Sequence, residues 1–120
     1  MTAMPDPTAP GPLHRPVTPL RRPARPTPDE AYALMVAGNA RFAANTPARP
    51  NQDDARRVQL VAGQEPFAAV LGCADSRVPA EIVFDQGLGD LFVCRTAGPI
   101  VDFAVLGSIE FAITQLKVPL

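Results

Sequence analysis

Two short apolar runs, at residues 67–71 and 91–94, constrain the fold most strongly, because each is followed by loop residues and then by a helical pattern. Short apolar runs that end in Gly or in a polar loop are typical of buried strands. A strand, a crossover and a second strand predict a parallel pair. The sequence therefore predicts an α/β domain with a parallel sheet. We expect a further strand after the last helix, because two parallel strands alone make a poor sheet.

Helical signals lie before, between and after these runs. Thr27-Pro28-Asp29-Glu30 is a helix start, with Thr as N-cap, Pro at the first helical position and Glu three residues after the cap. We expect that helix to end near Ala44, and a second one to run from an Asn51 cap to a stop at Gly63. Further helices are predicted at residues 79–84 and 103–116. The two helices before the first strand are interpreted as packing or dimerisation arms.

The N-terminal segment differs from the rest, because nine of the fifteen prolines lie within residues 1–28. Proline removes a backbone donor and favours extended chain, so we expect a proline-rich disordered tail at 1–26 and one small domain at 27–120. The tail has arginines but no Lys run and no interleaved aromatic residues, which argues against nucleic-acid binding. No apolar run approaches the ~20 residues of a membrane-spanning helix. Two cysteines favour a reducing compartment, and cytoplasm is the expected location.

Cys73, Asp75 and Arg77 follow the first apolar run and form the candidate functional loop. In an open parallel sheet, ligands bind outside the carboxyl ends of the strands, which is where this loop is expected. Cys73 and Asp75 are of the types that bind zinc. Taken alone, the same residues also fit a structural ion pair between Asp75 and Arg77 beside a buried thiol at the end of a strand.

Three other kinds of site do not match the spacing. A phosphatase-type loop needs more residues between Cys and Arg than the three that separate Cys73 from Arg77. Gly87-Leu88-Gly89 begins a dinucleotide fingerprint, but Phe92 stands where the third glycine belongs. A cysteine nucleophile requires a histidine base, and the sole histidine of the chain, His14, lies in the predicted tail.

A longer pattern surrounds the candidate loop. Residues Cys73–Glu81 and Phe84–Val93 together resemble the N-terminal half of a β-class carbonic anhydrase. The match continues through Arg95, Ala97-Gly98, the helix at 105–110 and Val118-Pro119, and covers roughly residues 27–120. The resemblance implies helical arms followed by the parallel-sheet core of that family. It also implies a zinc-dependent lyase that interconverts carbon dioxide and bicarbonate.

The resemblance assigns roles in the loop. Cys73 matches the first zinc ligand of the family, and Asp75 and Arg77 match its Asp–Arg dyad. In the open form of the family site, Arg77 would hold Asp75 off the metal. In the closed form, Asp75 would itself ligate zinc.

The resemblance also implies contacts with substrate and with a partner. Gln64 matches a glutamine that hydrogen-bonds substrate across the dimer interface of the family, and Phe92 and Ala97 lie in stretches that wall the substrate pocket. The expected partners are therefore carbon dioxide or bicarbonate and a second protein chain, either as a homodimer or as a longer paralogue.

The chain departs from the family pattern in its zinc ligands. The family has a His-x-x-Cys pair just after the position of Val118-Pro119, so the ligand set within these 120 residues is incomplete and the domain is expected to be truncated. Cys94 is interpreted as a core thiol. Thr96 and Pro99 stand where the family has asparagines. We expect the isolated chain to lack carbonic anhydrase activity. The alternatives are a catalytically dead remnant that acts as a dimerisation or regulatory partner, and a small-molecule module that binds anions through Arg77.

Overall fold

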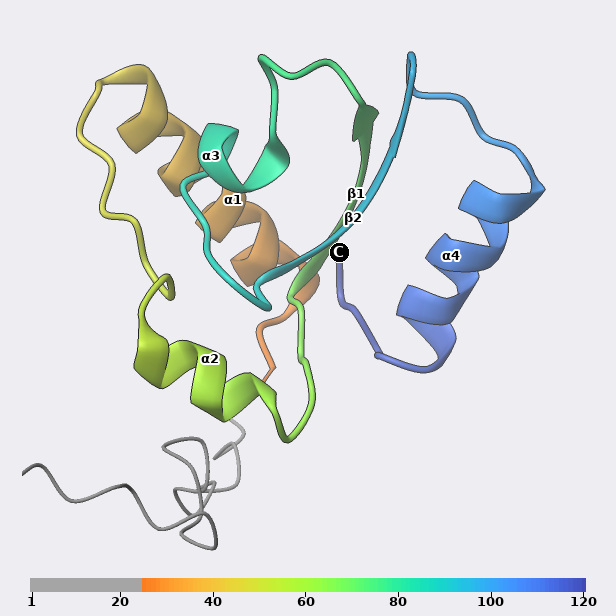
Figure 1. The fold of residues 1–120 in the computed structure, drawn as a ribbon, viewed down its shortest axis with the longest axis horizontal. Helices are drawn as coiled ribbons and strands as arrows, with labels where there is room; N and C mark the ends of the chain where they lie inside the picture. The colour runs from red at the N-terminus through yellow and green to blue at the C-terminus, as the bar shows by residue number, and fades with distance from the viewer. Residues whose placement is uncertain (1–24) are drawn as a thin grey trace, which may run out of the picture.

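The structure is a computed structural model that describes residues 25–120. It has a parallel pair of strands with helices on both faces (Figure 1). This confirms the predicted α/β class. The elements, in chain order, are α1 (Pro28–Ala43), α2 (Asp54–Leu60), β1 (Ala68–Cys73), α3 (Ala80–Val83), β2 (Leu91–Thr96) and α4 (Phe103–Thr114).

The helix starts show where local signals are sufficient. At α1, the Thr27 hydroxyl accepts from the Glu30 amide at 3.2 Å and the Glu30 carboxylate accepts from the Thr27 amide at 2.9 Å, so the predicted capping box is confirmed. The predicted Asn51 cap is wrong, since Asp53 caps α2. The Asn51 side chain instead donates to the Asp90 carboxylate at 2.9 Å, a partner that local sequence does not reveal.

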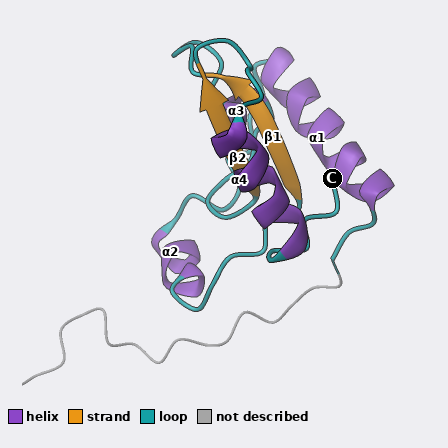
Figure 2. Ribbon diagram, turned by 90° about the vertical axis from the view of Figure 1, so that its right-hand side faces the viewer, coloured by secondary structure: helices purple, strands orange, loops and turns teal. Residues whose placement is uncertain are grey.

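The two strands are longer than predicted. Their register runs from Ala68 opposite Leu91 to Cys73 opposite Thr96, so β1 continues through Gly72 and ends at Cys73 itself. Successive residues of a strand point to opposite faces of the sheet. On one face, α1 and α3 pack around a core of Met35, Ala68, Ala80 and Leu91. Helix α4 covers the other face, where the Phe92 and Phe111 rings lie 6.2 Å apart (Figure 2).

The chain returns to the sheet after α4. The Ala69 amide of β1 donates to the Leu120 carbonyl oxygen at 2.7 Å, and Val118 is buried. Leu120 therefore lies beside β1, on the edge that β2 leaves open (Figure 2). That is where the expected third strand would lie.

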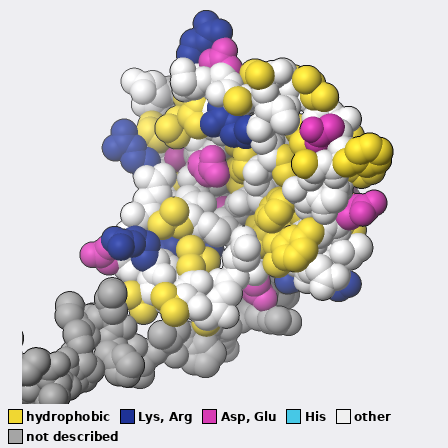
Figure 3. Space-filling view, turned by 45° about the vertical axis from the view of Figure 1, so that its right-hand side comes forward, with side chains coloured by type: hydrophobic (Ala, Val, Ile, Leu, Met, Phe, Trp, Pro, Cys, Tyr) yellow, Lys and Arg dark blue, Asp and Glu magenta, His cyan; other side chains and the backbone are white. Residues whose placement is uncertain are grey.

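Helix α4 has several exposed apolar side chains, with the exposed Glu110 and Thr114 among them (Figure 3). Phe103 is 93% exposed there, and Leu106 and Ile113 follow it at helical spacing with about half of each residue exposed. Exposed apolar side chains in such number on one helix favour association with another protein surface. None of the helices within residues 25–120 has the length and apolar character needed to cross a membrane.

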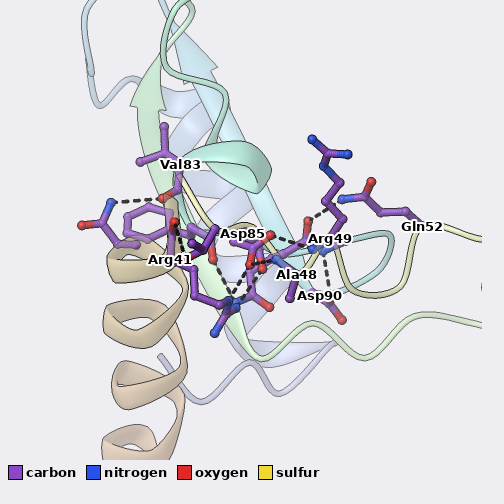
Figure 4. A network of polar contacts seen from close by, with 12 residues as sticks. Arg41, Ala48, Arg49, Gln52, Val83, Asp85 and Asp90 are labelled. Carbon is purple, nitrogen blue, oxygen red and sulfur yellow. Dashed lines mark hydrogen bonds and ion pairs between the residues drawn. The ribbon is translucent and has the colours of Figure 1, made fainter. Parts of the chain in front are cut away.

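A polar network joins α1 to the turn after α3 (Figure 4). The buried Asp85 carboxylate accepts from Arg41 Nε at 2.5 Å and from the backbone amides of Ala48 and Arg49 at 2.8 and 2.9 Å. The Arg41 side chain is the main cause that holds the pKa of Asp85 below its usual value, and the Ala48 amide adds to it. This network docks α1 on the core, and no local sequence pattern indicated it.

The predicted tail at 1–26 lies mostly outside the described residues. Of its last residues, Arg25 is described, and its guanidinium donates to the carbonyl oxygens of Leu116 and, at 2.6 Å, Lys117. These carbonyls belong to the segment that follows α4 and its C-cap Gln115. Arg25 therefore links the segment before α1 to the end of α4.

Candidate active site

The candidate site lies at the edge of the sheet where both strands end. The loops that follow β1 and β2 leave from this shared edge (Figure 1). The Ala74 amide donates to the Thr96 carbonyl oxygen at 2.6 Å, which extends the pairing of the strands into the first loop residue. The carboxyl ends of parallel strands thus bring Cys73 and the residues after Thr96 together, as predicted for an α/β sheet.

The Cys73 sulfur is held by two backbone amides. The amide nitrogens of Asp75 and Gly98 lie 3.4 and 3.3 Å from Cys73 Sγ. The Asp75 amide and then the Gly98 amide lower the pKa of the Cys73 thiol, because both stabilise the thiolate. The thiolate is the form of cysteine that binds metal ions, so this environment prepares Cys73 to act as a ligand.

Asp75 and Arg77 form a two-pronged pair. Arg77 Nε lies 3.0 Å from Asp75 Oδ1 and Arg77 Nη2 lies 2.6 Å from Asp75 Oδ2, while the Arg77 amide also donates to Oδ1. The Arg77 side chain is the main cause that lowers the pKa of Asp75. The Arg77 side chain is 85% exposed, and exposed ion pairs contribute little stability. The main effect of this pair is therefore to orient the Asp75 carboxylate.

The last two residues of β2 order the two loops of the site through their side chains. Thr96 Oγ1 donates to the Gly98 carbonyl oxygen and accepts from the Ile100 amide at 3.0 Å, so the hydroxyl closes this loop. Arg95 donates to the carbonyl oxygens of Cys73 and Asp75 at 2.8 and 2.5 Å. The sequence placed Arg95 within the family match and Thr96 at a departure from it, but it indicated neither set of hydrogen bonds.

The remaining predicted site residues lie at different distances from Cys73. Ala97 is exposed in the loop after β2. Phe92 is the second residue of β2 and lines a hollow of about 300 Å³ between β2 and α4. Gln64 precedes β1 and is exposed. A six-residue strand spans about 20 Å, so this chain does not bring its own Gln64 to Cys73.

The donor set fits a metal ion only in part. Cys73 has the thiolate-stabilising environment of a ligand, and Asp75 is a carboxylate two residues away. Cys94 is half-buried opposite Leu71 and lines the same hollow as Phe92, so it lies at the margin of the core rather than inside it. Within residues 25–120, no three His, Cys, Asp or Glu side chains gather to hold a metal ion.

Known proteins resemble this chain in sequence and in fold. The family profile described as carbonic anhydrase matches residues 68–120. Carbonic anhydrase 2 of Mycobacterium tuberculosis is 58% identical over 93 residues, covering 78% of this chain and 45% of that protein. The solved β-carbonic anhydrase of Coccomyxa, in complex with acetazolamide, has a TM-score of 0.52 at 28% identity, covering 70% of this chain and 38% of that one. One of two tetrameric β-carbonic anhydrases of Sordaria macrospora has a TM-score of 0.50 at 29% identity. The match covers 72% of this chain and 44% of that one. The chain therefore spans about half the length of the curated relatives it matches.

Proposed function

This chain is a homologue of the β-class carbonic anhydrases, and from that premise we propose that its Cys73 loop is part of a zinc centre that interconverts carbon dioxide and bicarbonate. The observation that carries the proposal is the pair of amides on Cys73 Sγ, from Asp75 and Gly98. These amides stabilise the Cys73 thiolate next to the oriented Asp75 carboxylate. The sequence around them is 58% identical, over 93 residues, to a carbonic anhydrase.

The residues of the loop have distinct proposed roles. Cys73 would hold zinc as a thiolate, and zinc when bound is the Lewis acid that lets water ionise near neutral pH. Asp75 is turned toward Arg77 by the two-pronged pair, so its carboxylate stays ionised and available as a hydrogen-bond acceptor. If Arg77 releases it, Asp75 becomes a second ligand from the same loop.

The proposal requires further ligands from outside the described residues. Two donors do not hold a catalytic zinc ion, because zinc sites of this kind use three protein ligands. The additional ligands would come from further polypeptide, either covalently joined or supplied by a partner chain. We therefore propose that residues 25–120 alone do not sustain hydration of carbon dioxide. The substrate contacts of Gln64, Phe92 and Ala97 belong to the same proposal, with Gln64 acting across an interface between two chains.

A chimera tests the proposal. The part of the M. tuberculosis relative that this chain does not match is joined to it, and zinc content and carbon dioxide hydration are measured for the chimera and for the 120-residue chain. We expect about one zinc ion per chimera with hydration activity. The Cys73→Ser chimera should lose both, whereas the matched Cys94→Ser control keeps both. A folded chimera without zinc, or one indifferent to Cys73→Ser, would refute the proposal.

A second candidate is a non-catalytic partner that associates with another chain. The exposed apolar side chains of α4, Phe103 above all, favour it, as does the absence of a three-ligand group among the described residues. Retention of dimers or higher assemblies by the 120-residue chain in sedimentation, without zinc, would support this candidate.

The two free cysteines favour a reducing compartment, and we propose cytoplasm.

A further inference from the structure

We propose that Arg95 is the positioning residue of the candidate site, and that it holds the Cys73–Asp75 turn in the conformation that places the sulfur and the carboxylate side by side. That the turn serves a zinc centre rests on the proposed function. The hydrogen bonds that carry the inference belong to the fold itself.

The geometry of Arg95 matches the turn in two places. Nε donates to the Cys73 carbonyl oxygen at 2.8 Å, and Nη2 donates to the Asp75 carbonyl oxygen at 2.5 Å. These carbonyls lie on either side of Ala74, so one side chain fixes two peptide groups of the same turn. The guanidinium is a rigid fork of donors, which makes a simultaneous grip on two acceptors possible.

Arg95 acts on backbone, whereas Arg77 acts on a carboxylate. Among the described residues Arg95 forms no ion pair, so its charge-assisted bonds go to the two carbonyls. With those peptide groups held, the Asp75 amide points at Cys73 Sγ and the Asp75 side chain is left for Arg77. Arg95 therefore positions both site residues through their backbone.

The position of Arg95 on β2 explains why it can do this. Arg95 is the fifth of the six residues of β2 and pairs with Gly72, the residue before Cys73. It therefore reaches the turn from a neighbouring, already paired strand rather than from the turn itself. A turn that is held from a rigid element has a better defined geometry than one that is held by its own residues.

Amide hydrogen exchange of the 120-residue chain tests the inference without zinc and without catalysis. In Arg95→Gln and Arg95→Lys, we expect the amides of residues 74–77 to exchange about tenfold faster, the effect of losing one or two hydrogen bonds. Amides within β1 and β2 should keep their rates within about twofold. Lysine keeps the charge but lacks the fork, so it should not restore the turn.

Arg56→Lys is the matched control. Arg56 also binds a loop carbonyl, with its Nε 2.8 Å from the Leu88 carbonyl oxygen, but it lies outside the candidate site. It should leave residues 74–77 unchanged. The inference is overturned if neither Arg95 variant speeds exchange in the turn, if Arg95→Lys retains the wild-type rates, or if Arg95→Lys speeds exchange equally throughout the sheet. Arg95→Lys decides the question if Arg95→Gln does not fold. Since no zinc is involved, failure here is distinguishable from failure of the chimera.

Discussion

Replacing Gly38 by alanine places a methyl group where α1 crosses the end of α3. A Cβ atom built on Gly38 would lie 1.8 Å from the Phe84 carbonyl oxygen and 2.8 Å from its carbon. Both are backbone atoms, so no side chain can rotate away to make room. Helix α1 has to move away from α3, and that movement strains the bond from Asn39 Nδ2 to the Val83 carbonyl oxygen, which is 3.0 Å long.

Helix propensity and steric clash change the free energy of unfolding of Gly38→Ala in opposite directions. In a helix interior, alanine is favoured over glycine by about 1 kcal/mol. Forcing an extra methyl group into a packed contact costs about 1–3 kcal/mol, and losing the Asn39 hydrogen bond costs about 1 kcal/mol. The clash exceeds the propensity gain, so we expect Gly38→Ala to lower the free energy of unfolding by about 1–3 kcal/mol.

Gly107→Ala is the matched control, because Gly107 lies inside α4 and a Cβ atom at that position would have no neighbouring heavy atom within 4 Å. There the propensity term acts alone, and we expect the free energy of unfolding to rise by up to about 1 kcal/mol. Urea unfolding followed by circular dichroism measures both variants. The reasoning is refuted if Gly38→Ala is at least as stable as the wild type while Gly107→Ala gains stability as expected.

Three further predictions concern the titrating groups. In a Cys94→Ser background, the rate of Cys73 alkylation by iodoacetamide should rise with pH, with a midpoint below the ordinary thiol value of 9.0. A midpoint at or above 9.0 would contradict stabilisation of the thiolate by the Asp75 and Gly98 amides. Arg77→Ala should raise the pKa of Asp75, followed by NMR of its carboxyl carbon, because the Arg77 side chain is the main cause of its low pKa. Asp85 has a lowered pKa when folded, so its contribution to stability is complete above the ordinary value of 3.8 and is lost as pH falls through the folded value. The stability deficit of Asp85→Asn in urea unfolding should therefore shrink in acid, and a deficit independent of pH would count against the network.

Local signals were sufficient for the elements that are stabilised by near neighbours. The start of α1 could be predicted because the Thr27 hydroxyl and the Glu30 carboxylate each accept a hydrogen bond from the other residue's backbone amide, within one turn. The α/β class was readable because two apolar runs alternate with helical patterns. The end of β1 could not be predicted from local sequence. The predicted strand ended at Gly72, whereas in the structure Gly72 pairs with Arg95 and Cys73 pairs with Thr96, so β1 continues to Cys73.

The candidate site divides in the same way. Cys73, Asp75 and Arg77 were found from sequence because they lie within one turn and resemble a family motif. The support from Arg95 and Gly98 comes from across the sheet, more than twenty residues away in the chain. No periodicity or local motif encodes such pairs, because they depend on which strand ends at the same edge.

By itself, the sequence determined the order of helices and strands, the capping of α1 and the loop that carries the site, since these depend on side chains a few residues apart. Only the tertiary structure decided that Asn51 binds Asp90 rather than capping α2, that Asp85 joins α1 to the core, and that Arg95 holds the turn after β1. The physical reason is the same in each case. A polar side chain bonds to the partner that folding brings within about 3 Å, and a one-dimensional pattern does not give that distance.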